Sequence, residues 1–396
     1  MEGDLRLLLT FTYHGCPRIP FVPAFLSVPA FLLPHSFKAL RVILNWLTQQ
    51  GGQLLHYQWK KVPTLEGQEL SCTDSRSVKK LLAGIEEPRA FAVFRGDCKL
   101  LLSHVPNDTV DITITSPPYC IGKAYESEST TTEDFIRAQK EVLPEIVRVT
   151  KPGGSICWQI GYHVTDAAVF PLDYAIYDVL RGYREIILRN RIIWAFGHGL
   201  HSTTRFSGRH ETVLWFTKGD SYKFRLDSIR IPQKYPGKRH YKGNQKGEFS
   251  GNPLGKNPGD VWEMPNVNAN HVEKTEHPCQ FPIALAQRLI RALTPNDGLV
   301  FDPFLGVGST GAAAVIEKRR FLGAELNLRY AGISIKRLEQ AKSGTIRYRP
   351  PDKPIYTPRP TDAVATRPEH FKAEFTNGVQ ESCEGCFEKT GSKENL

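Results

Sequence analysis

The sequence predicts an α/β fold in which a mostly parallel sheet carries helices on both faces, and three features support this prediction. From residue 91 onward, short apolar runs alternate with amphipathic helical patterns, the order expected of a parallel sheet. Two of the runs, 110–114 and 299–301, lead directly into loops of unusual composition. The runs 185–194 and 212–216 are joined by a polar loop, which predicts a hairpin and therefore an antiparallel strand at the edge of the sheet.

The remaining elements follow from the period of the apolar residues and from the residues that begin and end each run. Strands are expected at 91–94, 110–114, 155–160, 185–194, 212–216, 299–301 and 321–324. Helices are expected at 100–102, 132–149, 169–180, 283–293 and 331–342, with an alanine-rich helix after residue 311. The helix at 132–149 begins at a Thr/Glu cap and ends before Lys151-Pro152-Gly153-Gly154, where proline and glycine interrupt it.

The net charge and the cysteine content indicate the kind of binding partner and the cellular compartment to expect. The 396-residue chain is 40% hydrophobic, enough for a sizeable core, and its net charge of +10 favours a polyanionic partner, either nucleic acid or an acidic membrane surface. Eight cysteines without framework spacing suit a reducing cytosol, so a cytoplasmic location is expected. Prolines interrupt the apolar run 21–33, so no membrane span is expected there. A signal peptide is not expected either, because the first residues, Met1-Glu2-Gly3-Asp4, are not basic. Cys383 and Cys386 have metal-ligand spacing but no second pair nearby, so no metal is expected.

The loop Thr115-Ser116-Pro117-Pro118-Tyr119 has the composition of a site that holds an amino group. Consecutive prolines fix φ and remove two backbone donors, which leaves the carbonyls of Ser116 and Pro117 free to face a ligand. The Ser116 hydroxyl supplies another acceptor, and the Tyr119 ring supplies a surface for stacking. We therefore interpret this loop as catalytic, although a merely structural proline-rich loop is an equal alternative for the loop taken alone.

The glycine-rich loop has the pattern of a nucleotide-type cofactor site. Gly306, Gly308 and Gly311 satisfy G-x-G-x-x-G between a strand and a helix, and the next strand ends in Glu325, which is spaced for binding ribose hydroxyls. A lone glycine pattern is weak, but this ordered set indicates an adenosine-type cofactor, with a nicotinamide-binding fold as the alternative. Asp97 stands at the carboxyl end of the first strand of this region and is a further candidate for cofactor contact.

A basic and aromatic segment separates the two loops. Between residues 218 and 246, cations alternate with tyrosine and phenylalanine, and regular structure fades through to residue 270. The cations can neutralise phosphates while the aromatic and amide groups reach bases, so we interpret this loop-rich insertion as a nucleic-acid surface; a solvated surface or a linker is the alternative. The candidate DNA-binding residues are Arg225, Arg230, Lys234, Lys238, Arg239 and Lys242.

Together, the loop 115–119, the segment 302–310 and Glu325 resemble the amino-methylating DNA methyltransferases, which move a methyl group from S-adenosylmethionine to a base amino group. The catalytic loop precedes the cofactor loop, which is similar to the permuted beta class of these restriction-modification enzymes. The resemblance covers 91–342 and implies a class I methyltransferase (Rossmann-like) sheet of seven strands, one of them antiparallel. It divides the chain into an extension of unknown role at 1–90, a catalytic half at 91–220, a target-recognition insertion at 221–270, a cofactor-binding half at 271–344 and an extended or disordered tail at 345–396.

The resemblance also implies roles for the site residues. The cofactor residues would be Asp97, Asp302, Phe304, Gly306, Gly308, Thr310 and Glu325. By the family pattern, Phe304 and the glycines wrap the methionine and sugar, and Asp302 lies near the methionine amino group. Glu325 binds the ribose hydroxyls and Asp97 faces the adenine, while the segment 277–281 encloses the methionine end. The catalytic residues would be Ser116, Pro117, Pro118 and Tyr119, which hold a flipped-out base for direct in-line displacement without a covalent enzyme intermediate.

The choice of base depends on the first position of the catalytic loop. Within the family, serine is typical of cytosine-N4 enzymes and aspartate of adenine-N6 enzymes, so Ser116 favours cytosine N4, with adenine N6 as the alternative. Cytosine C5 chemistry would need a thiolate, commonly in a Pro-Cys pair, and Pro278-Cys279 lies in the segment that resembles a cofactor-side motif of the family. An inactive DNA-binding homologue is a further alternative. The expected partners are double-stranded DNA and a separately acting restriction endonuclease, and the chain is expected to be a monomer or a homodimer.

Overall fold

The computed structural model describes residues 5–13, 24–28, 52–61, 82, 84–86, 88–119, 131–165, 168–197, 199 and 201–366. The chain divides into two compact units, Met1–Leu70 and Ser71–Leu396. In the first unit, β1 (Leu5–Tyr13) pairs antiparallel with both β2 (Ala24–Val28) and β3 (Gly52–Lys61). Most of the apolar run 21–33 and the pair Cys383 and Cys386 lie outside the described residues. The described helices include none with the length and apolar character of a membrane span.

The second unit is built on a sheet of eight strands in the order β11-β9-β10-β6-β5-β12-β13-β4. In chain order the strands are β4 (Phe91–Arg95), β5 (Val110–Thr115), β6 (Thr150–Ile160), β9 (Ile186–Ala195), β10 (His210–Lys218), β11 (Val261–Glu263), β12 (Leu299–Asp302) and β13 (Arg320–Glu325). Within this sheet β10 runs antiparallel to both of its neighbours, and the other pairings are parallel. The prediction of a mostly parallel α/β sheet with one antiparallel strand is confirmed.

Two details of the predicted sheet are wrong. The antiparallel strand β10 does not form an edge, because it lies between β6 and β9 and hydrogen-bonds to both. Its residues from Val213 to Phe216 are all buried, so both of its sides and both of its faces need covering. The sheet also has an eighth strand, β11, which adds to the outer side of β9 from the end of the insertion.

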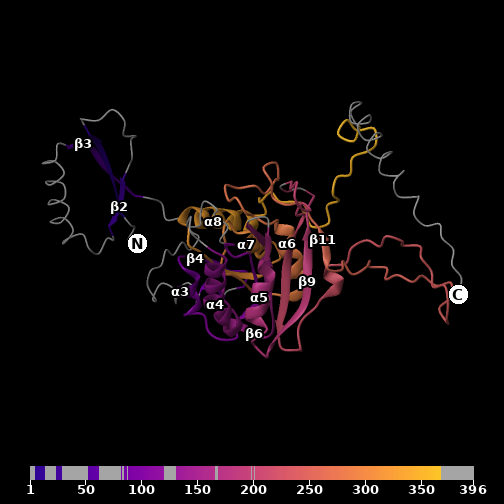
Figure 1. The fold of residues 1–396 in the computed structure, drawn as a ribbon. Helices are drawn as coiled ribbons and strands as arrows, with labels where there is room; N and C mark the ends of the chain where they lie inside the picture. Colours follow the sequence, from indigo (N-terminus) through magenta and orange to yellow (C-terminus); the bar gives the residue numbers. More distant parts are fainter. Residues whose placement is uncertain are drawn as a thin grey trace. The chain divides into compact units, whose positions relative to one another are not determined.

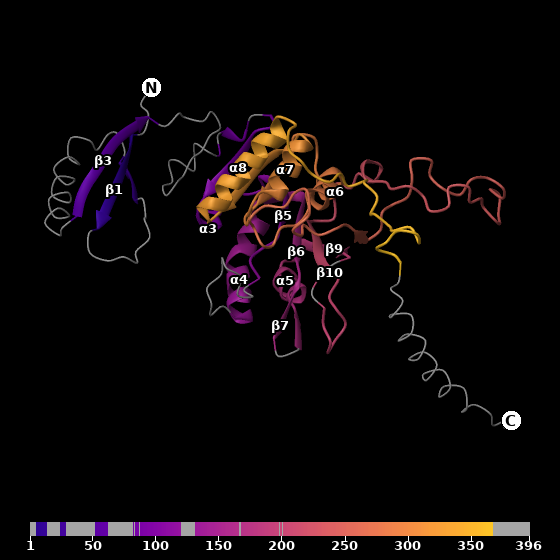
Figure 2. The ribbon, with the colours of Figure 1, turned by 90° about the horizontal axis from the view of Figure 1, so that it is seen from above.

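Helices cover both faces of the sheet (Figures 1 and 2). One row contains α3 (Cys98–Leu102), α4 (Thr132–Val149) and α5 (Leu172–Leu180), and the other contains α6 (Ile283–Leu293), α7 (Ser309–Ile316) and α8 (Leu328–Lys342). The N-terminus of α4 is closed by a capping box between Thr131 and Asp134. The helix expected at 169–180 begins only at Leu172, because Ala168–Pro171 forms β8 and pairs with β7 (Tyr162–Thr165).

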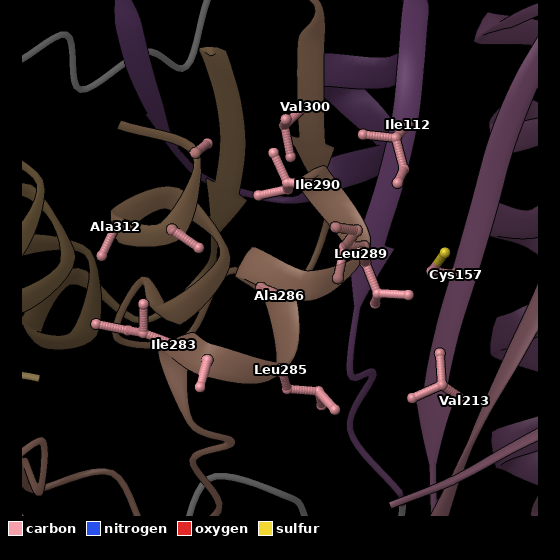
Figure 3. Close-up of a cluster of buried hydrophobic side chains, with 14 of the residues drawn as sticks. Ile112, Cys157, Val213, Ile283, Leu285, Ala286, Leu289, Ile290, Val300 and Ala312 are labelled. Carbon is pink, nitrogen blue, oxygen red and sulfur yellow. The ribbon is translucent and has the colours of Figure 1, made fainter. Parts of the chain in front are cut away.

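The core holds together two strands that are far apart in sequence. On one face of the sheet, α6 turns Leu289 and Ile290 toward Ile112 of β5 and Val300 of β12, as Figure 3 shows. All four side chains are buried, and burial of an aliphatic side chain of this size contributes about 1.5–3 kcal/mol. This packing supports the parallel pairing of Val300 with Ile112, and so the loops that follow β5 and β12 leave the sheet side by side.

The insertion at 221–270 is loop-rich, as expected, and it projects as a long arm (Figure 2). It contains the short 3-10 turn η2 (Leu226–Ser228), the isolated antiparallel bridges Ile231–Lys256 and Arg239–Phe249, and β11. The described part of the tail, 345–366, has neither helix nor strand. Its first residues nevertheless lie on the domain, because Ile346 and Tyr348 pack against the hydrophobic core.

A stability prediction follows from the turn that joins β12 to α7. Gly308 has a φ of 83°, and a Cβ there would lie 2.9 Å from the Cβ of Ser334. Gly308→Ala should therefore lower the free energy of unfolding by about 1–3 kcal/mol. The control Gly332→Ala lies within α8 with open space around it, and it should raise that free energy by about 0.5–1 kcal/mol. Urea denaturation of the ligand-free protein measures both, and equal effects would contradict the turn geometry.

Candidate functional site

The catalytic and glycine-rich loops line one cavity. It has a volume of about 430 Å³ and lies where the carboxyl ends of β4, β5, β12 and β13 meet. Its wall contains all four predicted catalytic residues, together with Asp97, Phe304, Gly306 and Glu325 from the predicted cofactor set, and it also contains His277, Cys279 and Phe281. Motifs spread over more than half of the chain therefore converge on one space.

A buried hydrogen bond ties the two loops together at their bases. Thr115 donates its hydroxyl hydrogen to Oδ1 of Asp302 at 2.6 Å, and the same oxygen accepts from the backbone N–H of Phe304 at 3.1 Å. From the other direction, Thr310 donates its hydroxyl hydrogen to the carbonyl of Ile114 at 3.2 Å. The last residues of β5 and the turn after β12 are thus fixed relative to each other.

Three of the predicted cofactor residues lie behind the cavity wall. Asp302 is 1% exposed, and neither it nor Gly308 nor Thr310 lines the cavity. Burial raises the pKa of Asp302 to about 6, although the hydrogen bond from Thr115 opposes that shift. Oδ2 of Asp302 has no hydrogen-bond partner among the described residues. In this structure the three residues support the loop from behind the cavity wall.

Glu325 lines the cavity and is held by the backbone on both of its oxygens. Oε2 accepts from the N–H of Gly306 at 2.7 Å, and Oε1 accepts from the N–H of Asn327 at 2.7 Å. Burial raises the pKa of this carboxyl to about 7. Asp97 lies at the same end of the sheet, where its carboxylate caps α3 by accepting from the N–H of Lys99 at 2.9 Å. Both groups keep lone pairs that a hydroxyl or amino group could use.

Behind Ser116, a chain of hydrogen bonds leads into the protein. The hydroxyl oxygens of Ser116 and Tyr119 are 3.3 Å apart, and Nε2 of Gln159 lies 3.1 Å from the Tyr119 hydroxyl. The same Nε2 also donates to the carboxyl of Glu211. Burial raises the pKa of Glu211 to about 6 and raises the pKa of Tyr119 well above its usual value. Tyr119 is therefore neutral, and its ring and hydroxyl are fixed by this chain.

Sequence reasoning did not assign Gln159 and Glu211 to the site. Gln159 lies one residue before the end of the predicted strand 155–160, and Glu211 directly precedes the predicted strand 212–216, so their positions near strand ends were the available signal. What could not be read from the sequence is that β6 and β10 are direct neighbours, which places the two side chains within contact of Tyr119.

The remaining wall is uncharged at neutral pH and includes the rings of His277, Phe281 and Tyr330. The rings of His277 and Tyr330 meet edge to face with their centroids 4.7 Å apart, and Nδ1 of His277 accepts from the N–H of Cys279 at 3.1 Å. Burial lowers the pKa of His277 to about 4, so the imidazole is neutral at physiological pH. Within the described part of the chain, no cluster of His, Cys, Asp and Glu side chains has the arrangement of a metal site.

The predicted DNA-binding residues fall into two groups. Arg225 donates to the carbonyl of Thr294 at 2.6 Å and to Asn296 at 3.2 Å, while Arg230 donates to Asp227 at 2.6 Å and to the carbonyl of Gly255 at 2.9 Å. Arg225 therefore holds the base of the insertion to the domain, whereas Arg230 joins two segments within the insertion. The exposed group, farther along the arm, consists of Lys234, Lys238, Arg239 and Lys242.

Two threonines on β5 test the contact that joins the loops. Thr115→Val removes the donor to Asp302 and leaves a buried carboxyl less satisfied, so it should lower the free energy of unfolding by about 1–3 kcal/mol. Thr113, two residues earlier, is equally buried, and its hydroxyl has no hydrogen-bond partner in the described structure. Thr113→Val should therefore be neutral or stabilising in the same denaturation experiment. A greater loss for Thr113→Val than for Thr115→Val would show that the contact between β5 and Asp302 is unimportant.

Comparison with known proteins identifies the family. A family model described as DNA methylase, of the N6/N4 type, matches residues 110–336. The chain is 45% identical over 243 residues to the Type II methyltransferase M.BglII of Bacillus subtilis, a match that covers 61% of this chain and 67% of that protein. It is 30% identical over 259 residues to the DNA adenine methyltransferase YhdJ of Escherichia coli, covering 64% of this chain and 84% of that one.

The fold agrees with this assignment. The solved structure of the PvuII DNA methyltransferase (cytosine-N4-specific) superposes with a TM-score of 0.50 at 18% identity, and the match covers 66% of this chain and 95% of that chain. At this level of sequence identity, the structural similarity is evidence for the fold alone. Because the family model spans more than half of the sequence and includes both loops of the cavity, the protein belongs to the N6/N4 DNA methylase family and is a DNA methyltransferase.

Proposed function

We propose that the protein transfers a methyl group from S-adenosylmethionine to the exocyclic N4 of cytosine in double-stranded DNA. The observation that carries the proposal is the shared cavity, since Ser116 and Tyr119 form one side of it and Phe304, Gly306 and Glu325 form another. A base amino group and a methyl donor bound there would face each other.

The cofactor side of the cavity has the groups that an adenosine-type methyl donor needs. Glu325 is fixed by two backbone donors and offers its remaining lone pairs to the ribose hydroxyls. Asp97 is positioned by its capping role to accept from the adenine amino group. Phe304 packs edge to face on Trp158 at 6.2 Å, and His277 with Tyr330 closes the methionine end. In this proposal, Asp302, Gly308 and Thr310 act by holding the loop in shape.

An exocyclic amino group is a poor nucleophile, because its lone pair is delocalised into the ring of the base. The side of the cavity formed by the loop 115–119 would increase its nucleophilicity. Ser116 and the carbonyl of Pro117 accept the amino hydrogens and favour pyramidal nitrogen, while Pro118 keeps the loop rigid. The sulfonium of the bound donor supplies an electrophilic methyl group. A nitrogen–carbon bond then forms as the carbon–sulfur bond breaks, promoted by positioning and electrostatics. S-adenosylhomocysteine is the leaving group, and the methylated nitrogen loses one proton to water. Tyr119 would stack on a base flipped out of the duplex.

The choice of cytosine N4 over adenine N6 rests on Ser116 at the first loop position. Relatives point both ways, because one similar protein is named as an adenine methyltransferase and one structure with the same fold is named as cytosine-N4-specific. The protein should be expressed in a host free of DNA methylation, whose DNA is then analysed by nucleoside mass spectrometry. N4-methylcytosine is the expected product. Detection of N6-methyladenine instead would show that the target is adenine N6 and not cytosine N4. The absence of both methylated bases would overturn the proposal.

The arm is proposed to bind the DNA through its exposed cations. Lys234, Lys238 and Lys242 are exposed, and the guanidinium of Arg239 lies 4.0 Å from the ring centre of Phe249. These groups are placed to neutralise phosphates, whereas Arg225 ties the base of the arm to the domain and Arg230 makes its contacts within the arm. A cytoplasmic location, action as a monomer or homodimer and a separate restriction endonuclease complete the proposal.

Ser116 is predicted to act in catalysis and not in cofactor binding. Ser116→Ala should lower kcat about 10²–10³-fold, the usual effect of removing one oriented polar group from a reaction site. Its Kd for S-adenosylmethionine, measured by calorimetry, should stay unchanged. The matched control is Cys279→Ser, since Cys279 also lines the cavity but has no role in direct displacement, and this variant should keep full activity. Full turnover by Ser116→Ala, or loss of turnover by Cys279→Ser in a folded protein, would contradict the mechanism.

Glu325 is predicted to make cofactor binding depend on pH. Its pKa in the free protein is raised to about 7 by burial, whereas ribose hydroxyls that donate to it favour the carboxylate and lower that pKa. Binding near neutral pH should therefore release protons, and affinity should rise as the pH is raised through about 7. Calorimetry in buffers of different ionisation enthalpy measures the release.

Two variants separate this effect from general weakening of the site. Glu325→Gln should abolish the proton release, and it should also bind more weakly because a glutamine oxygen can accept from only one of the N–H groups of Gly306 and Asn327. Asp97→Asn should weaken binding but preserve the proton release. Affinity of the unmodified protein that is constant from about pH 6 to 8 would refute the role of Glu325.

A further inference from the structure

Phe206 is a fully exposed aromatic side chain on the loop between β9 and β10. It is 99% exposed, more than any other large hydrophobic side chain that the structure describes. Single exposed apolar residues are common on protein surfaces, so exposure alone has no functional meaning. The hydrogen bonds of the backbone around Phe206, its place in the fold and its charged neighbour Arg205 distinguish it.

Local hydrogen bonds hold the backbone around Phe206. The hydroxyl of Ser202 accepts from the N–H of Arg205 at 3.3 Å, and the N–H of Ser202 donates to the hydroxyl of Ser207 at 3.1 Å. The Arg205 guanidinium donates to the carbonyl of Phe206 at 3.3 Å. The segment 202–207 is therefore a defined turn, and it holds the phenyl ring away from the protein surface.

This turn is anchored beside the acceptor side of the cavity. Gly208 lies so close to the Tyr162 hydroxyl that a Cβ at residue 208 would overlap with it, and the Arg205 guanidinium lies 6.0 Å from the centre of the Tyr162 ring. The preceding residue, Gly161, is in turn next to Tyr119, since a Cβ at residue 161 would be 3.3 Å from Cε2 of that ring. Two steps of direct contact thus connect the Phe206 turn to the catalytic loop.

The polypeptide that follows the turn leads directly to the hydrogen-bonded residues behind Ser116. Glu211 lies three residues after Gly208, and its carboxyl accepts a hydrogen bond from Gln159. Gln159 in turn contacts the hydroxyl of Tyr119. The Phe206 turn and the wall on which the target base is proposed to stack are therefore joined by direct contacts.

We propose that Phe206 is the wedge that enters the duplex and occupies the space left by the flipped target base. This inference rests on the proposed function. Flipping breaks the stacking of the target base, and an apolar side chain inserted between base steps replaces part of the lost contact. Arg205, beside the ring, is placed to meet the phosphate next to the gap. Duplex DNA fits both groups, an apolar ring for the base stack and a cation for the backbone.

Substitution of Phe206 combined with a modified duplex tests the wedge. With an ordinary target site, Phe206→Ala should lower kcat/KM by about 10- to 100-fold, while Phe206→Trp should retain most of the activity. Cofactor affinity and the midpoint of urea unfolding should not change, since the side chain makes no buried contact. Tyr356→Ala, an exposed aromatic on the tail, serves as the matched control and should behave like the unmodified protein.

The decisive experiment uses a duplex with a pyrene nucleotide opposite the target base. Pyrene fills the gap in the stack, so it should restore Phe206→Ala to nearly the activity of the unmodified protein. It should not restore Ser116→Ala, whose defect lies in the chemistry. Full activity of Phe206→Ala on the ordinary duplex, or a defect that pyrene leaves unchanged, would overturn the wedge. An unmodified protein that methylates no DNA would instead refute the proposed function.

Discussion

The hydrogen bond between Thr115 and Asp302 is the contact on which the rest of the site depends. It joins residues 187 positions apart in the sequence, at the ends of two strands that pair in parallel. In the proposed function, the loop after β5 carries the acceptor groups and the loop after β12 carries the cofactor groups, so their relative position would decide whether a transfer can occur. Because the contact is buried and short, water does not compete for it.

Burial of polar groups around this contact gives the site its electrostatic character. The pKa values of Asp302, Glu211 and Glu325 are all raised by burial, and the pKa of His277 is lowered by the same cause. Of these four groups, Glu325 and His277 line the cavity; near pH 7 the Glu325 carboxyl, with a pKa of about 7, is partly protonated, and the His277 imidazole is neutral. A cationic sulfonium and a neutral base would enter a space where fixed carbonyls, hydroxyls and backbone N–H groups are already oriented, and such groups need little reorganisation during reaction.

Much of the fold could be predicted from the sequence because local patterns and global topology agree. The alternation of strands and helices fixed the class, and loops at strand ends placed Ser116 and Gly306 at the same edge. The position of β10 could not be predicted, because a hairpin pattern shows which strands are consecutive but not which strand lies next to β6. The short strand β11 has three residues and no periodicity to detect.

The sequence predicted most residues of the candidate site, but it did not predict which of them line the cavity and which lie buried behind its wall. A motif identifies Asp302, Gly308 and Thr310, yet only the packing shows that they lie behind the cavity wall. Charge alone grouped Arg225 and Arg230 with the lysines of the arm, although both arginines are engaged by carbonyls of the domain and arm base. Gln159 and Glu211 entered the site through the pairing of β6 with β10, which brings together residues that share no sequence motif.

The central claim is that one cavity holds the methyl donor and the base amino group in line. A crystal structure of the protein with S-adenosylhomocysteine and a duplex containing the target site tests this most directly, through the position of the sulfur relative to the amino nitrogen. The account predicts a nitrogen hydrogen-bonded to Ser116 and to the Pro117 carbonyl, facing the sulfur across the space of one methyl group. A sulfur bound elsewhere, such as in the second cavity between Trp215 and Trp262, or an amino group turned away from it, would contradict the account.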